Sequence, residues 1–194
     1  MEQKKNKLLS DMIQNDTDKK MVQLVEAATD LSCGDICTLL EVAHSLPFVG
    51  NLEGGDTYIN VLTREKESMV IAQYRHPNYD LYKRSIIGEI ERREDEPAVY
   101  RALEEGISGR GLIGIIDEGR TVVRHTVSPI LNSEKKLIGA LTYEYPNAGA
   151  DTESIRIINN QEGKQDPFNR QLGKASDYLQ DAILLYDANG ICTF

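Results

Sequence analysis

Several features that mark common protein classes are missing from this sequence of 194 residues. No segment approaches the roughly 20 consecutive apolar residues that span a bilayer. The first residues, MEQKKNKLLSDMIQND, lack the apolar core of a signal peptide. Only three cysteines are present, Cys33, Cys37 and Cys192, which are too few and too unevenly spaced for a disulfide framework. We therefore expect a cytoplasmic protein with no membrane partner.

The sequence also lacks an excess of positive charge. It has 22 lysines and arginines against 31 aspartates and glutamates, which gives a formal net charge of −9. A surface that binds nucleic acid should be basic, so we expect no nucleic-acid partner. Hydrophobic residues make up 40% of the chain, enough for the core of one domain of about 100–150 residues with flanking helices.

The N-terminal part of the chain predicts helices. Ser32 to Asp35 resembles a capping box that opens a helix, and we expect Pro47 to end that helix. Before it, apolar residues recur at helical spacing, namely Met21, Leu24, Val25, Ala28 and Leu31.

After residue 55 the spacing of the apolar residues changes from helical to alternating. Residues 57–62 and 68–75 predict an antiparallel pair of strands, and residues 85–90 predict another short strand. Pro97 and Gly106 mark the start and the end of a helix.

Three further strands are predicted close together at 111–117, 120–129 and 136–145, joined by short turns as a meander. The order of elements predicts an α+β domain with a central antiparallel sheet. We expect helices on one face of the sheet and a gap of ligand size on the other.

Motifs for catalysis or metal binding are not recognisable. His44, His76 and His125 lie far apart, and none belongs to a His-Glu-x-x-His pattern, so we interpret them as surface or partly buried polar residues. Cys33 and Cys37 share one helix face and could bind a soft metal with two further ligands. Because the domain has no second pair, we favour two small core-facing thiols. We expect no catalytic residue and no metal site, and a binding or interaction module.

The best candidate for ligand binding is the tyrosine-rich stretch YRHPNYDLY. It gathers residues near the end of a predicted strand, where binding residues tend to lie: Tyr74, Arg75, His76, Tyr79 and Tyr82. The alternative is a solvated loop whose tyrosines cover the sheet edge. Strand alternation places Arg124 opposite His125 and places Tyr143 opposite Thr142 and Glu144, so both sheet faces mix apolar and hydrogen-bonding groups. This suits a small-molecule pocket and equally a solvent-exposed sheet edge.

Three stretches resemble one protein family. VIAQYRHPN (70–78), EPAVYRALEEG (96–106) and VSPIL (127–131) are similar to the N-terminal sensor domain of a group of cytoplasmic bacterial histidine kinases. The resemblance covers about residues 20–146. It implies a GAF-like fold and a sensory input function, with a PAS domain following in the chain. The tail DAILLYDANGICTF resembles the first hairpin of such a PAS domain.

The resemblance implies a division of the chain into four parts. These are an N-terminal helical lead (1–17), a GAF-like sensor domain (18–149), a connecting helix (150–182) and the truncated start of a PAS domain (183–194). We expect this fragment to have no cofactor and no kinase activity, since the phospho-acceptor histidine and the ATP-binding domain of the family are not recognisable in it. The full-length protein is implied to be a homodimeric kinase that uses ATP and magnesium and phosphorylates a response regulator with an RNA-binding antiterminator output.

One branch of the family controls ethanolamine utilisation, so the resemblance suggests ethanolamine as the ligand. A small cation needs a carboxylate and aromatic faces, and Asp56, Glu89, Tyr74 and Tyr143 are our candidates for those roles. Two alternatives stay open. The domain could serve ligand binding or dimerisation in a transcription regulator, or it could be a GAF-fold methionine sulfoxide reductase, which would need reactive cysteines near its pocket.

Overall fold

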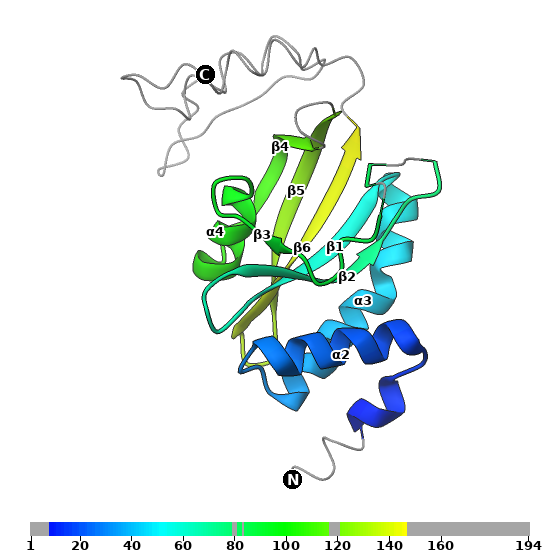
Figure 1. Ribbon diagram of the computed structural model, residues 1–194, viewed down its shortest axis with the longest axis vertical. Coiled ribbons are helices and arrows are strands. Elements are labelled where there is room, and N and C mark those ends of the chain that lie inside the picture. Colours follow the sequence, from blue (N-terminus) through cyan, green and yellow to red (C-terminus); the bar gives the residue numbers. More distant parts are fainter. Residues whose placement is uncertain (1–7, 79–80, 83, 117–120, 147–194) are drawn as a thin grey trace. The chain divides into compact units, whose positions relative to one another are not determined.

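A six-stranded antiparallel sheet forms the centre of the computed structural model (Figure 1), which describes residues 8–78, 81–82, 84–116 and 121–146. The order of the strands across the sheet is β3-β2-β1-β6-β5-β4. The strands are β1 (Asp56–Leu62), β2 (Ser68–Tyr74), β3 (Ile90–Glu91), β4 (Gly109–Ile116), β5 (Thr121–Leu131) and β6 (Leu137–Pro146).

The predicted meander is confirmed, because β4, β5 and β6 pair in sequence order. The sheet is completed by pairing the last strand with the first: β6 lies beside β1, with Tyr58 opposite Thr142 and Asp56 opposite Glu144. The prediction of an α+β domain built on an antiparallel sheet is therefore correct.

Two helices cover one face of the sheet. Helix α2 (Asp16–Ala28) has Asn15 as its N-cap, and the Asn15 side chain accepts a hydrogen bond from the Asp18 N–H. Helix α3 (Cys33–Glu53) begins at Ser32 with the predicted capping box. They bury a core against the sheet that includes Met21, Val25, Ile36, Leu39, Leu40, Ile59, Val61 and Ile71.

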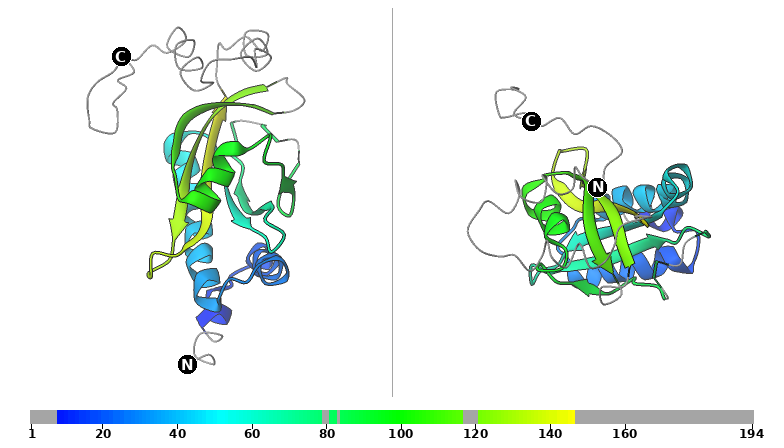
Figure 2. Two further views of the ribbon diagram at one scale, coloured as in Figure 1. Left: turned by 90° about the vertical axis from the view of Figure 1, so that its left-hand side faces the viewer. Right: turned by 90° about the horizontal axis from the view of Figure 1, so that it is seen from above.

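Helix α4 (Pro97–Glu105) packs on the opposite face, an arrangement that can be followed in Figure 2. A Cβ atom on Gly139 would lie 3.1 Å from Leu39 of α3, whereas the adjacent Ala140 packs in a cluster with Val99 and Ala102 of α4. Successive residues of a strand point to opposite faces, so α3 and α4 lie on opposite sides of the sheet. As expected, α4 ends at Gly106, which adopts a left-handed conformation with φ of 68°.

Gly55 joins α3 to β1 at a very close approach of two backbone segments. A Cβ atom at this position would lie 2.1 Å from the Glu144 carbonyl oxygen. No side chain fits there, so only glycine allows α3 to pass this closely to β6.

The prediction that Pro47 ends its helix is wrong. Pro47 lies inside α3, and the helix continues to Glu53 with Gly54 in a left-handed conformation as its C-cap. Proline removes one backbone hydrogen bond, at a cost of about 3 kcal/mol. Packing on both sides of it offsets that cost, because Leu46 is buried in the core and Gly50 lies against the Tyr74 ring.

The short strand predicted at 85–90 is also largely wrong. Only Ile90 and Glu91 form a strand, β3, which pairs with β2 at Ser68 and Met69. The residues before it follow the sheet as a turn in which the Gly88 N–H donates to the Val70 carbonyl oxygen. Gly88 has a φ of 94°, which breaks the extended geometry that a strand requires.

The connecting helix expected at 150–182 and the PAS start expected at 183–194 lie outside the described residues. Across the part of the chain that the structure describes, every helix is too short or too polar to traverse a lipid bilayer.

Asp35 fixes the start of α3 to the turn between β5 and β6. It accepts hydrogen bonds from the Ser32 N–H (3.0 Å) and hydroxyl (2.9 Å) and from the Asn132 amide (2.7 Å). Burial raises the pKa of Asp35, but these hydrogen bonds and the nearby Lys136 charge outweigh burial and hold that pKa below its ordinary value. The ionised carboxylate is thus the form that stabilises the fold.

We predict that Asp35→Ala lowers the free energy of unfolding by about 2–4 kcal/mol at neutral pH, because it removes a cap and leaves buried donors without acceptors. The matched variant Asp16→Ala, at a side chain that is 96% exposed, should change it by less than about 1 kcal/mol. The measurement is urea unfolding of both variants. Since the folded pKa of Asp35 is lowered, its contribution is present above pH 4 and is lost as the pH falls through that pKa. A difference between wild type and Asp35→Ala that does not shrink in acid would contradict this account.

Candidate ligand-binding site

The sheet face beneath α4 buries polar side chains next to apolar ones. Tyr58 and Asn60 of β1 and Thr142 and Glu144 of β6 each have 0% of their surface exposed. Alternate residues of a strand point to one face, and Tyr58 pairs with Thr142 across the sheet. These four side chains therefore lie together on the same face, where purely apolar packing would not need them.

The segment from residue 84 to α4 lies over this face and brings two carboxylates to it. The Oε2 atom of Glu91 accepts hydrogen bonds from the Asn60 amide (2.6 Å) and the Ser68 hydroxyl (3.2 Å). The Tyr100 hydroxyl holds the segment down, because it donates to the Glu91 carbonyl oxygen and accepts from the Ser68 N–H. Glu96, at the N-cap of α4, makes no capping hydrogen bond.

Glu144 lies at the base of this arrangement and is held by two phenols. Its Oε1 atom accepts from the Tyr58 hydroxyl at 2.9 Å, and its Oε2 atom accepts from the Tyr82 hydroxyl at 2.6 Å. Burial and the Glu144 charge raise the pKa values of both tyrosines, so both remain hydrogen-bond donors at neutral pH.

His125 of β5 completes a cluster of three potential ligands. Its Nδ1 atom lies 3.7 Å from Glu96 Oε2 and 3.7 Å from Glu144 Oε1. The His125 side chain is 7% exposed. Within the described residues, neither His125 Nδ1 nor Glu96 Oε2 has a hydrogen-bond partner. Buried polar atoms are normally paired, so this cluster can accept a further group.

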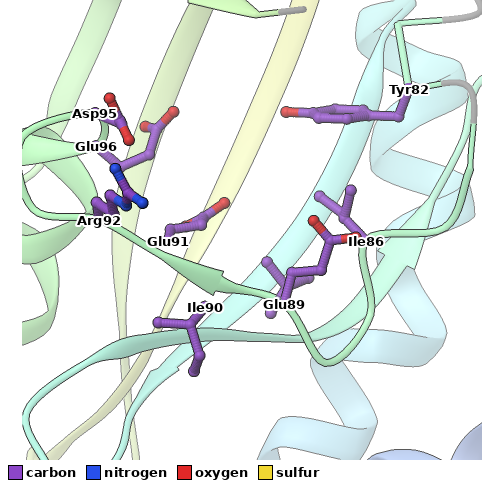
Figure 3. Close-up of a pocket in the computed structure, with 9 residues that line it drawn as sticks. Tyr82, Ile86, Glu89, Ile90, Glu91, Arg92, Asp95 and Glu96 are labelled. Atoms are coloured by element: carbon purple, nitrogen blue, oxygen red, sulfur yellow. The ribbon is translucent and has the colours of Figure 1, made fainter.

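A cavity of about 300 Å³ opens beside the cluster. Figure 3 shows Tyr82 and Glu91 pointing toward one another from its two sides. Four carboxylates and one guanidinium line it, so its charge is acidic. The lining residues are Val70, Tyr82, Ile86, Glu89, Ile90, Glu91, Arg92, Asp95 and Glu96, and we call this space the acidic pocket.

The pKa values of two carboxyl groups in the acidic pocket are raised. Burial, followed by the Glu144 charge, raises the pKa of Glu91 to about 7 and that of Glu96 to about 9. At neutral pH Glu96 therefore carries its proton, and Glu91 is about half ionised. Such shifts are typical of functional sites, because burying several carboxyl groups together costs free energy.

Comparison with known proteins assigns the chain to a family. The sequence profile of the GAF domain of histidine kinase PdtaS matches residues 21–162, more than half of the chain. The chain belongs to this family of GAF domains. Comparison with curated protein sequences gives no match.

One solved structure supports the fold. A structure described as the sensor region of a sensor histidine kinase has a TM-score of 0.52 and 13% identity, and the similarity covers 90% of this chain and 64% of that one. At this identity it supports the GAF-like fold alone, and our chain spans less than two thirds of its length. The phycoerythrobilin-bound GAF domain of a cyanobacterial phytochrome has 15% identity and a TM-score of 0.38, with coverage of 80% and 88%, a score too low to support a conclusion.

Of the binding residues predicted for this GAF domain, Tyr82 and Glu89 line the acidic pocket. Asp56 lies on the same sheet face but accepts the His76 backbone N–H at 2.7 Å, and both residues are buried outside the pocket lining. Arg75, next to His76, is exposed.

The other predicted residues lie elsewhere. Tyr74 and Tyr143 contact the end of α3 on the opposite face, where Tyr74 donates to Asn51 and Tyr143 to the Glu53 carbonyl oxygen. Arg124 precedes His125 on β5 and therefore points to the face away from the pocket. Tyr79 lies outside the described residues.

The two N-terminal cysteines lie on the α3 side of the sheet. Cys37 is buried in the core between α3 and the sheet, and Cys33 packs against the same core. Burial raises the pKa of the Cys37 thiol, which keeps it protonated and unreactive. The placement agrees with core-facing thiols, and neither of these two cysteines lines the acidic pocket, where a methionine sulfoxide reductase would need reactive ones.

Sequence reasoning missed Glu91, Glu96, His125 and Glu144 as site residues. Strand alternation assigned His125 to one face of its strand and Glu144 to one face of another strand. It could not show that the two residues lie beside one another. The pairing of His125 with Glu144 depends on the β5–β6 register. The position of Glu91 and Glu96 depends on the irregular segment before α4, for which the sequence has no periodic signal.

We predict that the free energy of unfolding of this GAF domain falls as the pH rises from 5 to 9. The folded pKa values of Glu91 and Glu96 are raised, so their favourable state is the protonated one, present at low pH and lost through about 7 and about 9. Each carboxyl contributes a slope of up to about 1.4 kcal/mol per pH unit in its range. Urea unfolding across this pH range measures the slope.

Glu96→Gln should remove the part of this slope between about pH 7 and pH 9, where Glu91 no longer contributes, and should raise stability there, because glutamine stays neutral. Glu105→Gln, at an exposed position on α4, is the matched control and should leave the slope unchanged. An equal slope for wild type and Glu96→Gln would show that the pKa of Glu96 is not raised in the folded domain.

Proposed function

We propose that this GAF domain is the sensory input domain of a two-component histidine kinase and that its acidic pocket binds a small cation. The observation that carries the proposal is the set of carboxyl groups buried together on one sheet face. Glu91, Glu96 and Glu144 converge there, and among the described residues that line the pocket Arg92 is the one cationic side chain. Membership of a histidine-kinase GAF family supports the sensory role.

The charge of the pocket and its aromatic ring both favour a cation. A cation between these carboxyl groups would offset their mutual repulsion, whereas an anion would add to it. The pocket also offers the aromatic ring of Tyr82, which packs edge-on against Tyr58 at 6.3 Å between ring centres. Aromatic faces and carboxylates together are the groups that bind organic ammonium ions.

In the proposed scheme, binding biases a larger protein. The full-length chain is an ATP- and magnesium-dependent histidine kinase that works as a homodimer, contains a PAS domain after residue 183 and phosphorylates a response regulator. The ligand shifts the dimer between two arrangements because it binds one of them more tightly. The helices on either side of the GAF domain carry the change toward the kinase.

Ethanolamine is the organic cation to test first, because the family resemblance points to it. Its neutral and anionic counterparts of similar size are ethylene glycol and glycolate. We predict that ethanolamine raises the Tm of the chain and that the other two do not. A ligand at 100 times its Kd stabilises by about 2.7 kcal/mol, which corresponds to a rise of about 5–10 °C. Thermal unfolding at pH 7.5 with millimolar ligand measures it.

The variants Glu91→Gln and Glu96→Gln should abolish this rise, whereas Glu105→Gln should retain it. Stabilisation by glycolate would contradict the proposed ligand charge. A rise with ethanolamine that survives both pocket substitutions would place the ligand elsewhere on the domain.

A further inference from the structure

We propose that Glu96, His125 and Glu144 bind one divalent first-row transition-metal ion at the inner end of the acidic pocket. The inference rests on the proposed function, since it names the cation as a metal ion at the same site. It goes against the expectation from sequence that the domain has no metal site. The three residues come from the start of α4, from β5 and from β6, which meet only in the folded domain.

The distances approach those of a metal centre. Each residue offers one ligand atom, and these three atoms lie within 4.8 Å of one another. At metal–ligand distances of about 2.0–2.2 Å, neighbouring ligands of a tetrahedral ion are about 3.3–3.6 Å apart. The two separations of 3.7 Å from His125 Nδ1 are close to this range. A small movement of the two carboxylates toward each other completes the site.

His125 supplies an observation independent of the carboxylates. Its side chain is 7% exposed, and its Nδ1 atom lies near two carboxylate oxygens without a hydrogen-bond partner among the described residues. A neutral imidazole nitrogen is the commonest metal ligand in proteins, because its lone pair is a strong donor. A metal ion would satisfy this nitrogen and the unpaired Glu96 Oε2 together.

The surroundings of Glu144 resemble the outer shell of a metal site. The Tyr58 and Tyr82 hydroxyls each donate to one of its oxygens, which fixes the orientation of the carboxylate. Hydrogen bonds to ligating carboxylates are a regular feature of metal centres. Two carboxylates and one imidazole suit divalent first-row ions, because imidazole binds ions of intermediate softness such as Zn²⁺ and Co²⁺ and carboxylates also bind the harder Mn²⁺.

Two other places in the domain combine possible ligands and provide controls. Cys33 and Cys37 lie at the start of α3. His44 Nε2 lies 3.1 Å from Asp18 Oδ2, between α2 and α3. Neither place has three such ligands together, because within the described residues the only group of three is the one formed by Glu96, His125 and Glu144.

The test is a titration of the chelator-treated chain with Co²⁺, followed by calorimetry and by absorption spectroscopy. We expect one ion per chain, with d–d absorption and without a sulfur-to-cobalt charge-transfer band. His125→Gln and Glu144→Gln should weaken binding by about 100-fold or more, since loss of an outer-shell partner alone costs about 10–100-fold. Tyr58→Phe, which removes only an outer-shell hydrogen bond, should weaken binding by about 10–100-fold.

Controls separate ligand loss from unfolding. His44→Gln and the double variant Cys33→Ser with Cys37→Ser should bind Co²⁺ as wild type does. Glu96→Gln replaces a buried carboxyl group by a neutral one of equal size, so it should stay folded by circular dichroism and still lose the ion. Binding that persists in Glu96→Gln and His125→Gln, binding that vanishes in the cysteine variant, or no binding to wild type would each overturn the metal site.

The metal site and the proposed function can fail separately. If Co²⁺, Zn²⁺ and Mn²⁺ do not bind but ethanolamine stabilises the chain in a Glu96-dependent way, the site is one for an ammonium ion and the metal inference is wrong. If neither the binding of metal ions nor the stabilisation by ethanolamine depends on Glu91 or Glu96, both the metal site and the cation-binding function are wrong.

Discussion

The structure depends on the burial of one carboxylate, that of Glu144, inside a sheet. The side chain is fully enclosed, and two tyrosine hydroxyls, an imidazole and a second carboxyl group surround it. Burying an ionisable group this deeply is costly unless it is hydrogen-bonded or paired. β6 lies inside the sheet between β1 and β5, and the hydroxyls of Tyr58 and Tyr82 each donate to one oxygen of the Glu144 carboxylate. A domain that needed only stability could use apolar residues at these positions.

The two faces of the sheet bury different kinds of side chain. The face under α2 and α3 is an apolar core to which the cysteines contribute only packing. The face under α4 has two smaller apolar clusters with the polar site between them. The residues of the larger apolar core are thus separate from those of the proposed binding site.

Much of the fold was predictable from local patterns. The strand alternation, the capping box at Ser32 and the helix between Pro97 and Gly106 each depend on a few neighbouring residues, and each was correct. Pro47 was misjudged because its local cost is offset by packing of Leu46 and Gly50 at a distance in sequence. The site was harder still. Glu91, Glu96, His125 and Glu144 come from four segments, and only strand register and an irregular loop bring them together. Of the described residues in the tyrosine-rich stretch, Tyr82 is the one that lines the pocket.

The close contact at Gly55 gives Glu144 a second role. The side chain of Glu144 lies in the site, while its carbonyl oxygen leaves no room for a side chain at the junction between α3 and β1. Glu144 is also two residues from the end of β6. Glu144 thus links the proposed cation site to the junction where β1 begins and to the end of β6. In the proposed scheme, a displacement of this one residue by the ligand would reach both of these points directly.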